Sequence, residues 1–128
     1  MAWENLPSTN TPLNATNLDK ITDSGSNANG KYIKLQDGTL IQWGNKTIEN
    51  VSFTQLTSGI NYSTAQSITY PIAFYSNPSS SIMSRTRNLS WTINVVSSTT
   101  ALGFYVVNSG SGSTDVSVEW IAIGRWKA

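Results

Sequence analysis

The chain has 128 residues, a net charge of +1 and charged side chains at only 12% of its positions. This length fits one domain, and the weak charge argues against a nucleic-acid binder, which usually carries a strongly basic patch. The chain has no Cys, which excludes disulfides and Cys-ligated zinc, and no His, the commonest general base and transition-metal ligand. We therefore expect no metal, no cofactor and no nucleic-acid partner.

Uncharged polar residues dominate the composition, since Ser, Thr, Asn and Gly account for 56 of the 128 residues. Such residues favour turns and solvate a surface without charge. Together with five Trp and five Tyr, they are typical of polar β proteins, including those that face carbohydrate. No apolar run approaches the roughly 20 residues that span a bilayer, and the first ten residues lack the features of a signal peptide. We expect no membrane insertion.

Residues 1–30 differ from the rest, being polar with two prolines and few apolar side chains. Asn14 is a good cap for a short helix that would extend to about Thr22, and the sequence SGSNANG over 24–30 is typical of a linker. A two-turn helix needs a surface to pack on. We expect an N-terminal segment, helical or extended, that serves attachment or trimerisation; the alternative is a frayed terminus.

From Lys31 onward the pattern is that of short strands. Asp37 and Gly38 predict a type I′ turn between the apolar runs of 31–35 and 40–43. Residues 48–63 look like a less regular connection. Further strands are predicted at 67–71, 80–87, 89–95, 102–107 and 115–126, with turns at 74–78, 97–100 and 108–114. The spacing predicts an all-β fold, an antiparallel β-sandwich of about 6–7 strands, over residues 31–128.

The last strand has two apolar faces. Trp120 and Ala122 lie on one face, and Ile121 and Ile123 lie on the other. Strands that are apolar on both faces are expected where both faces are buried. We therefore expect a homo-oligomer in which copies of the chain cover one sheet; the alternative is a monomer with a central strand.

Three segments together resemble the C-terminal head domain of phage tail fibres. They are GKYIKLQDGTLIQWG at 30–44, ITYPIAFYSNPSSSIMS at 68–84 and VEWIAIGRWKA at 118–128. The resemblance covers about residues 30–128. Near the N-terminus, WENLPSTNTPLNATNLDKI is similar to the openings of tail or baseplate proteins in phages of Gram-positive bacteria.

This resemblance implies a homotrimeric β-sandwich similar to H-type lectins, which binds a cell-surface glycan without cleaving it. It places the protein at the tail tip of a virion, made in the bacterial cytoplasm and acting outside the cell. Residues 1–30 would contact other tail or baseplate proteins. The chain has no repetitive shaft, so it resembles a short fibre, a baseplate tip or a terminal fragment.

A sugar site uses aromatic faces and a few fixed polar groups near strand ends. The candidate ligand-binding residues are Tyr75, Arg85, Arg87, Asn88, Trp91 and Asp115. They would form a shallow pocket, either within one chain or between chains.

Each of these assignments has a structural alternative. Trp91 alternates with apolar residues and is expected to be core if it is not a ligand contact. Arg85 and Arg87 are expected to pair with Glu119 or Asp115 if they bind no ligand. Trp43 and Trp120 are expected to pack in the core or at a trimer axis.

Two other functions compete with receptor binding. A polysaccharide-degrading tail enzyme would need two carboxylates about 5–10 Å apart. Asp115 and Glu119 share a strand face but lie about 13 Å apart by strand rise, so no catalytic residue is predicted. The third class is a structural virion component that binds no ligand.

Overall fold

The computed structural model describes residues 20–85 and 90–128, which form ten antiparallel strands. Sheet A has the order β1-β2-β3-β10-β7, and sheet B has the order β4-β5-β9-β6, with β8 on the other edge of β9. The strands of sheet A are β1 (Ile21–Asn27), β2 (Gly30–Leu35), β3 (Thr39–Phe53), β7 (Ser79–Ser84) and β10 (Gly112–Arg125). Those of sheet B are β4 (Gln55–Thr57), β5 (Ile60–Tyr62), β6 (Gln66–Thr69), β8 (Ser90–Ser97) and β9 (Ala101–Asn108).

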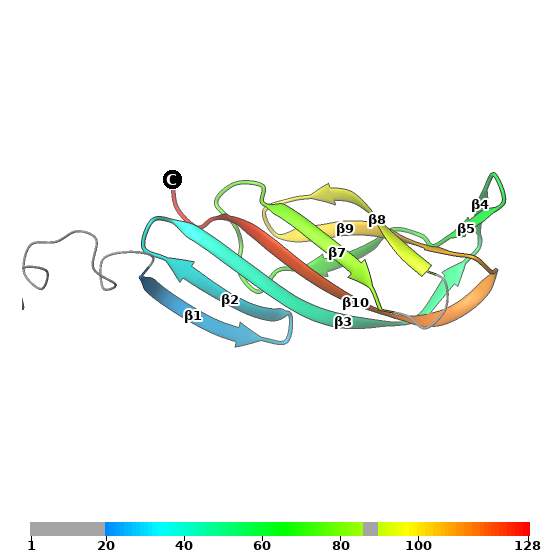
Figure 1. Ribbon diagram of the computed structural model, residues 1–128, viewed down its shortest axis with the longest axis horizontal. Coiled ribbons are helices and arrows are strands. Elements are labelled where there is room, and N and C mark those ends of the chain that lie inside the picture. Colours follow the sequence, from blue (N-terminus) through cyan, green and yellow to red (C-terminus); the bar gives the residue numbers. More distant parts are fainter. Residues whose placement is uncertain (1–19, 86–89) are drawn as a thin grey trace, which may run out of the picture.

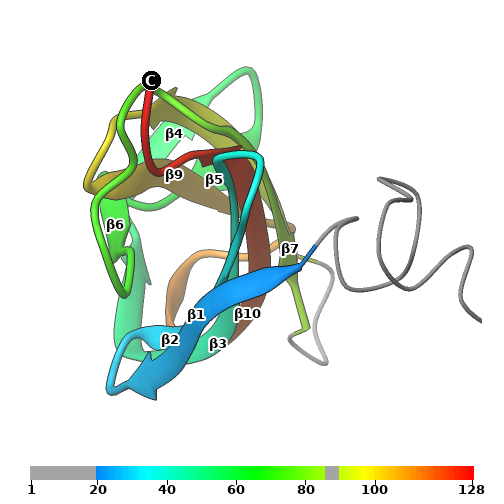
Figure 2. The same cartoon turned by 90° about the vertical axis from the view of Figure 1, so that its left-hand side faces the viewer.

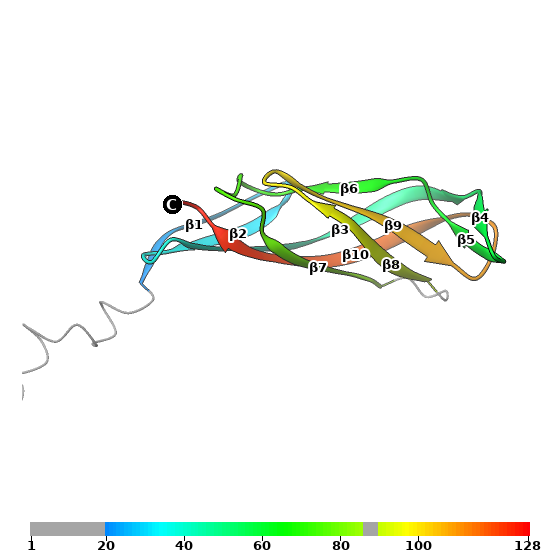
Figure 3. The same ribbon diagram turned by 90° about the horizontal axis from the view of Figure 1, so that it is seen from above.

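The two sheets face each other as an elongated sandwich (Figures 1 and 2). The long strands β3 and β10 run along the molecule, with the C-terminus at one end and the β4–β5 hairpin at the other (Figures 1 and 3). The prediction of an all-β antiparallel sandwich is confirmed, although with more strands than the sequence indicated. Within the described ranges no helix is long and apolar enough to cross a membrane.

The core lies between the inner faces of β3, β10 and β9, with β6 and β7 closing its sides. Its fully buried members include Leu40, Leu102, Phe104, Val106, Val116, Val118 and Ala122. Trp120 belongs to it at 4% exposure, which confirms that its side chain packs in the core. The core follows from period-2 alternation, because every second residue points inward along most of β9 and β10 and at the start of β3.

A buried amide fastens the loop after β6 to sheet A. Gln42 is fully buried on β3; its Nε2 donates to the Ile72 carbonyl at 2.8 Å, and its Oε1 accepts the Ile72 N–H at 3.0 Å. The side chain thus completes the hydrogen bonds of a loop that has no strand neighbour there, as buried backbone groups require.

The two segments that carried the family resemblance at the chain ends are strand neighbours. In the β3–β10 register, Trp43 lies opposite Ile121, Gly44 lies opposite Trp120 and Gln42 lies opposite Ala122. The C-terminal segment also packs on the β2–β3 hairpin, since Trp126 Nε1 donates a hydrogen bond to the Leu35 carbonyl at 2.9 Å. Residues far apart in sequence therefore form the central pair of sheet A.

The β2–β3 turn is not the predicted type I′ turn. The Gly38 N–H donates to the Leu35 carbonyl at 3.1 Å, and Gly38 has a φ of 98°, whereas Asp37 has no positive φ. A type I′ turn needs positive φ at both central residues. The loop is instead a turn centred on Gln36 and Asp37 that ends in a left-handed Gly, the usual three-residue hairpin connection.

The predictions for two connecting segments are wrong. Ile21–Asn27, which covers the end of the predicted helix and most of the predicted linker, is strand β1 and pairs with β2. The remainder of that helix lies outside the described residues. The connection predicted at 48–63 begins as the continuation of β3, in which Val51 and Phe53 are buried. Both segments are polar on one side, and pairing in the sheet outweighs that local composition.

The apolar face of β8 points outward, which overturns the core alternative for Trp91. Trp91 is 48% exposed and Ile93 is 51% exposed. Between them Thr92 is half-buried, and its hydroxyl donates to the Ile82 carbonyl of β7 at 2.9 Å. The contact with β7 turns the polar side of β8 inward, so that its aromatic and apolar side chains lie on the surface.

Candidate functional site

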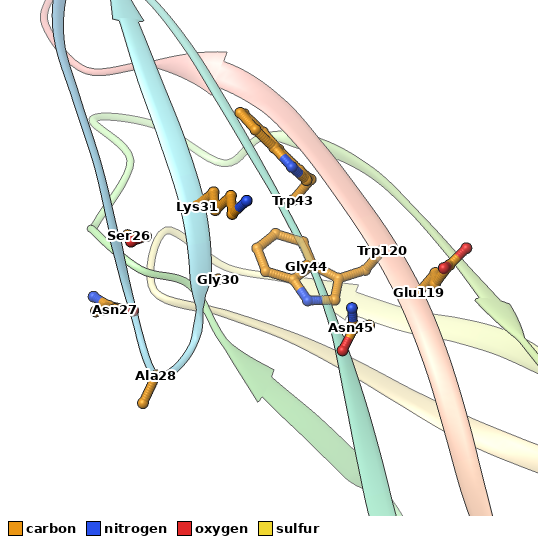
Figure 4. Close-up of a pocket in the computed structure, with 10 residues that line it drawn as sticks. All are labelled: Ser26, Asn27, Ala28, Gly30, Lys31, Trp43, Gly44, Asn45, Glu119 and Trp120. Atoms are coloured by element: carbon orange, nitrogen blue, oxygen red, sulfur yellow. The ribbon is translucent and has the colours of Figure 1, made fainter.

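A surface hollow of about 600 Å³ lies on sheet A beside the tip of the β1–β2 hairpin (Figure 4). We call it the hairpin hollow. Its lining combines the indoles of two Trp residues with amide, hydroxyl and charged groups: Ser26, Asn27, Ala28, Gly30, Lys31, Trp43, Gly44, Asn45, Glu119 and Trp120. Its volume lies within the range of small-molecule sites.

The strand register brings the outward-facing residues of this hollow into rows. Lys31 lies opposite Trp43, which in turn lies opposite Ile121, and Asn45 lies opposite Glu119. Directly opposed residues share a face of the sheet. Trp43 is 36% exposed, so its indole is partly open to solvent within the hollow and does not belong to the core; packing at a trimer axis stays a prediction.

Two glycines bring Trp120 to the edge of the hollow from the core side. A Cβ on Gly44 would lie 3.1 Å from Trp120 Nε1, and one on Gly30 would lie 3.1 Å from the same indole and 2.5 Å from the Trp43 carbonyl oxygen. Gly30 also has a φ of 144°, which side chains rarely adopt. The hollow therefore depends on Gly30, where no side chain fits, and on Gly44, where even a Cβ would press on its neighbours.

Trp120 Nε1 is the one buried side-chain nitrogen or oxygen without a hydrogen-bond partner in the described part of the chain. A buried N–H without an acceptor costs about 1–3 kcal/mol. Because this nitrogen has almost no accessible surface, a molecule in the hollow would not reach it, and the cost falls on the fold itself.

The charges at the hollow are asymmetric. Glu119 Oε1 accepts a hydrogen bond from Arg85 Nη1 at 2.6 Å, so its charge is already matched. This confirms the pairing alternative for Arg85. The ammonium of Lys31 pairs with no carboxylate of the described residues, and its end points toward the two indoles (Figure 4). The hollow thus has one uncompensated positive charge.

The sequence-predicted ligand residues that the structure describes, Tyr75, Arg85, Trp91 and Asp115, do not gather in one place. Tyr75 is 63% exposed in the loop before β7, and Trp91 lies on the outer face of sheet B. Arg85 follows β7 and reaches the hollow through Glu119. Arg87 and Asn88 lie outside the described residues.

Asp115 has a role in the backbone of sheet A. It lies where the β3–β10 register shifts between Thr114 and Val116, and its Oδ1 accepts the Asn50 N–H at 2.9 Å. Asn50 has a φ of 53°. The carboxylate therefore satisfies a donor at a β-bulge, a feature that locally disrupts the ladder.

Sequence reasoning missed most of the hollow. Ser26 and Asn27 were assigned to a linker, and Lys31, Asn45 and Glu119 were not among the predicted ligand residues, although Lys31 and Glu119 lie in segments that carry the family resemblance. The available signal was the face alternation of 40–44, in which Ile41 and Trp43 oppose Leu40 and Gln42. Because both faces are apolar in part, the sequence did not reveal which one is outside.

The remaining carboxylates of the described residues are spread over the molecule. No cluster of three or more Asp, Glu, His or Cys that could hold a metal occurs in residues 20–85 and 90–128. Hydrogen bonds from Thr39 lower the pKa of Asp37, with a further contribution from the positive charges of Arg125 and Lys127. Asp37 thus stabilises its turn.

Solved structures of pyocin fibres share this fold. A C-terminal part of the P. aeruginosa R1 pyocin fiber matches with a TM-score of 0.55 and 19% identity, over 85% of this chain and 30% of that one. An N-truncated R1-type pyocin tail fiber matches with a TM-score of 0.56 and 20% identity, over 91% of this chain and 98% of that one. A C-terminal part of the P. aeruginosa R2 pyocin fiber matches with a TM-score of 0.52 and 20% identity, over 80% of this chain and 25% of that one.

The chain thus spans about a third of the first of these structures, and less of the third. No curated protein matches the sequence. A family profile does match, over residues 34–125, and it describes the C-terminal part of gp53-like tail fiber proteins. The match covers well over half of the chain, from the first hairpin to the end of β10. The protein therefore belongs to the gp53-like tail fiber C-terminal family.

Proposed function

We propose that this tail fibre domain binds a host cell-surface saccharide in the hairpin hollow and does not cleave it. The observation that carries the proposal is the partly exposed indole of Trp43 in a concave, mostly polar site. A sugar ring presents C–H groups on one side and hydroxyls around its edge. An indole suits the first, and fixed polar groups suit the second.

The proposal of non-catalytic binding is supported by the state of the acids. Glycoside hydrolysis needs two carboxyl groups across one bond, one of them free to donate a proton. Glu119 lines the hollow but is held by Arg85, and Asp115 is held by the Asn50 N–H. The pair that the sequence offered therefore has structural partners.

Self-association as a homotrimer is proposed through the outer face of sheet B. This face exposes Trp91, Ile93, Val96 and Ile60 by 46–60%. None of the five strands of sheet B contains Lys, Arg, Asp or Glu. An uncharged apolar face can be covered by copies of itself without charge repulsion or desolvation of ions.

In this proposal the domain acts outside the bacterium at the tail tip, after synthesis in the bacterial cytoplasm. Residues 1–30 would attach it to other tail or baseplate proteins. Of these, residues 21–27 pair with β2, so the attachment would fall to the residues before β1. The competing function is a virion component with no ligand, for which the hollow would have no use.

The experiment compares the adsorption of purified protein to permissive host cells with that of two variants. Trp43→Ala should weaken adsorption about tenfold, the factor expected when a stacking contact of about 1.5 kcal/mol is removed. Tyr75→Ala is the matched control, because Tyr75 is an exposed aromatic residue that lies outside the hollow. It should adsorb like the unmodified protein.

Thermal unfolding and light scattering establish that both variants remain folded and assembled. If the unmodified protein adsorbs to no permissive host, receptor binding is wrong and the structural function is favoured. If Tyr75→Ala abolishes adsorption and Trp43→Ala does not, the site lies elsewhere. Release of sugar products from host polysaccharide would contradict the non-catalytic part.

A further inference from the structure

We infer that the saccharide bound in the hairpin hollow is acidic, carrying a carboxylate or phosphate that the Lys31 ammonium binds. The inference rests on the proposed function, since it concerns the ligand of the same site. It follows from the charges and from the hydrogen-bonding groups that the hollow leaves unengaged.

The charge argument starts with the three ionic groups at the site. Arg85 Nη1 lies 2.6 Å from Glu119 Oε1, so the charges of these two side chains compensate each other. Lys31 has no ion pair with any described residue, so the hollow has a net charge of about +1. An anion placed here gains a charge-assisted hydrogen bond, which is about twice as strong as a neutral one.

The second argument concerns which polar groups remain available. Asn27 is occupied, because its Nδ2 donates to the Pro71 carbonyl and its Oδ1 accepts the Asn29 N–H. Trp120 Nε1 has no acceptor, but it has almost no accessible surface, so it is not available to a ligand in the hollow. The Lys31 ammonium only donates, whereas the side chains of Ser26 and Asn45, which also line the hollow, can donate and accept and so suit a charged or a neutral ligand.

A ligand rich in acceptors fits the Lys31 ammonium better than one rich in donors. A carboxylate or phosphate offers several acceptor sites and no donor when ionised. A neutral sugar edge offers hydroxyls that donate and accept equally, so it gains less from the Lys31 ammonium. Trp43, which lies opposite Lys31 in the register, would take the apolar face of the ring.

The test uses three soluble disaccharides that differ only at C6 of the terminal ring: glucose, glucuronic acid and glucose 6-phosphate. Isothermal titration of the full chain should give at least one acidic sugar an affinity about fivefold higher than that of the neutral sugar. Added salt should weaken the binding of the acidic sugar and leave the binding of the neutral sugar unchanged. Which of the two acidic sugars binds more tightly distinguishes a carboxylate ligand from a phosphate ligand.

Lys31→Gln should abolish the preference while keeping the affinity for the neutral sugar. Lys20→Gln is the matched control, because it removes the same charge from an exposed lysine outside the hollow. If both variants lower the acidic affinity equally, the effect belongs to the overall charge and the inference is wrong.

The remaining outcomes separate this inference from the proposed function. Equal binding of all three sugars, or a preference for the neutral one, overturns the acidic ligand; if Trp43→Ala then weakens binding, the function stands. Binding of none, with host adsorption retained, also overturns the acidic ligand and leaves the function. Binding of none together with no host adsorption overturns both.

Discussion

The two sheets of this domain differ in where they hold charge. Every charged residue in the described part of the chain lies in a strand of sheet A or in a segment that flanks one: Lys20, Asp23, Lys31, Lys34, Asp37, Lys46, Glu49, Arg85, Asp115, Glu119, Arg125 and Lys127. The strands of sheet B hold none. Exposed apolar side chains, by contrast, occur on both.

Exposed apolar residues therefore have different neighbours on the two sheets: charged and polar residues on sheet A, and uncharged residues on sheet B. Ile121 and Ile123 are 44% and 46% exposed on sheet A, yet charged residues lie on the same sheet and a polar hollow lies beside them. On sheet B, Trp91, Ile93 and Val96 have only uncharged neighbours within their strands. Contiguous apolar surface of that kind marks an interface more often than isolated apolar residues do.

The largest effect is expected from placing a charge on sheet B. Ile93→Lys should convert a trimer into monomers, reducing the mass seen by light scattering about threefold, because an unpaired ammonium would be buried at each contact. Ile123→Lys, a matched change at a similarly exposed position of sheet A, should leave the trimer intact. A monomeric unmodified protein, or dissociation by the sheet A change alone, would contradict the assignment of the interface.

The next effect compares two glutamines, one in each sheet. Gln42→Leu should lower the free energy of unfolding by about 2–4 kcal/mol, because the Ile72 N–H and carbonyl would both lose their partner. The side chain of Gln66 in sheet B makes only exposed hydrogen bonds, to Thr64. Gln66→Leu should therefore change the free energy of unfolding by about 0.5 kcal/mol or less. Urea denaturation measures both, and similar losses would contradict the role given to Gln42.

The smallest effect concerns pH. The pKa of Asp37 is lowered in the fold, so its ionised form stabilises the protein above the unfolded pKa of about 3.9. That contribution is lost as pH falls through the lower folded pKa. Asp37→Asn should therefore be slightly less stable than the unmodified protein at pH 7, with the difference vanishing near pH 2–3. Unfolding followed from pH 7 to pH 2 tests this; a difference that grows on acidification has the wrong sign.

Much of the fold could be predicted because strand alternation is a local property. The β9 segment illustrates this: Leu102, Phe104 and Val106 share one face, and all three are fully buried. The strand at 21–27 was missed because its residues are small and polar, and only pairing with β2 makes it a strand. Its propensity alone gave no signal for a sheet edge.

The candidate site was less accessible to sequence reasoning. Trp91 and Ile93 have the same period-2 pattern as a core strand, yet they face outward because the polar side of β8 packs against β7. The hairpin hollow combines β1, β2, β3 and β10, and no spacing within the chain reports that arrangement. Lys31 and Glu119 line one site although they are far apart in sequence.

The sequence by itself determined the fold class, the family resemblance and the absence of Cys and His chemistry, because composition and strand period are carried by each segment alone. Only the tertiary structure decided which apolar faces lie inside, how β3 pairs with the last strand, and where the hairpin hollow lies. The physical reason is that a strand with two apolar faces can bury either one. The choice is made by its neighbours in the sheet and in the opposite layer.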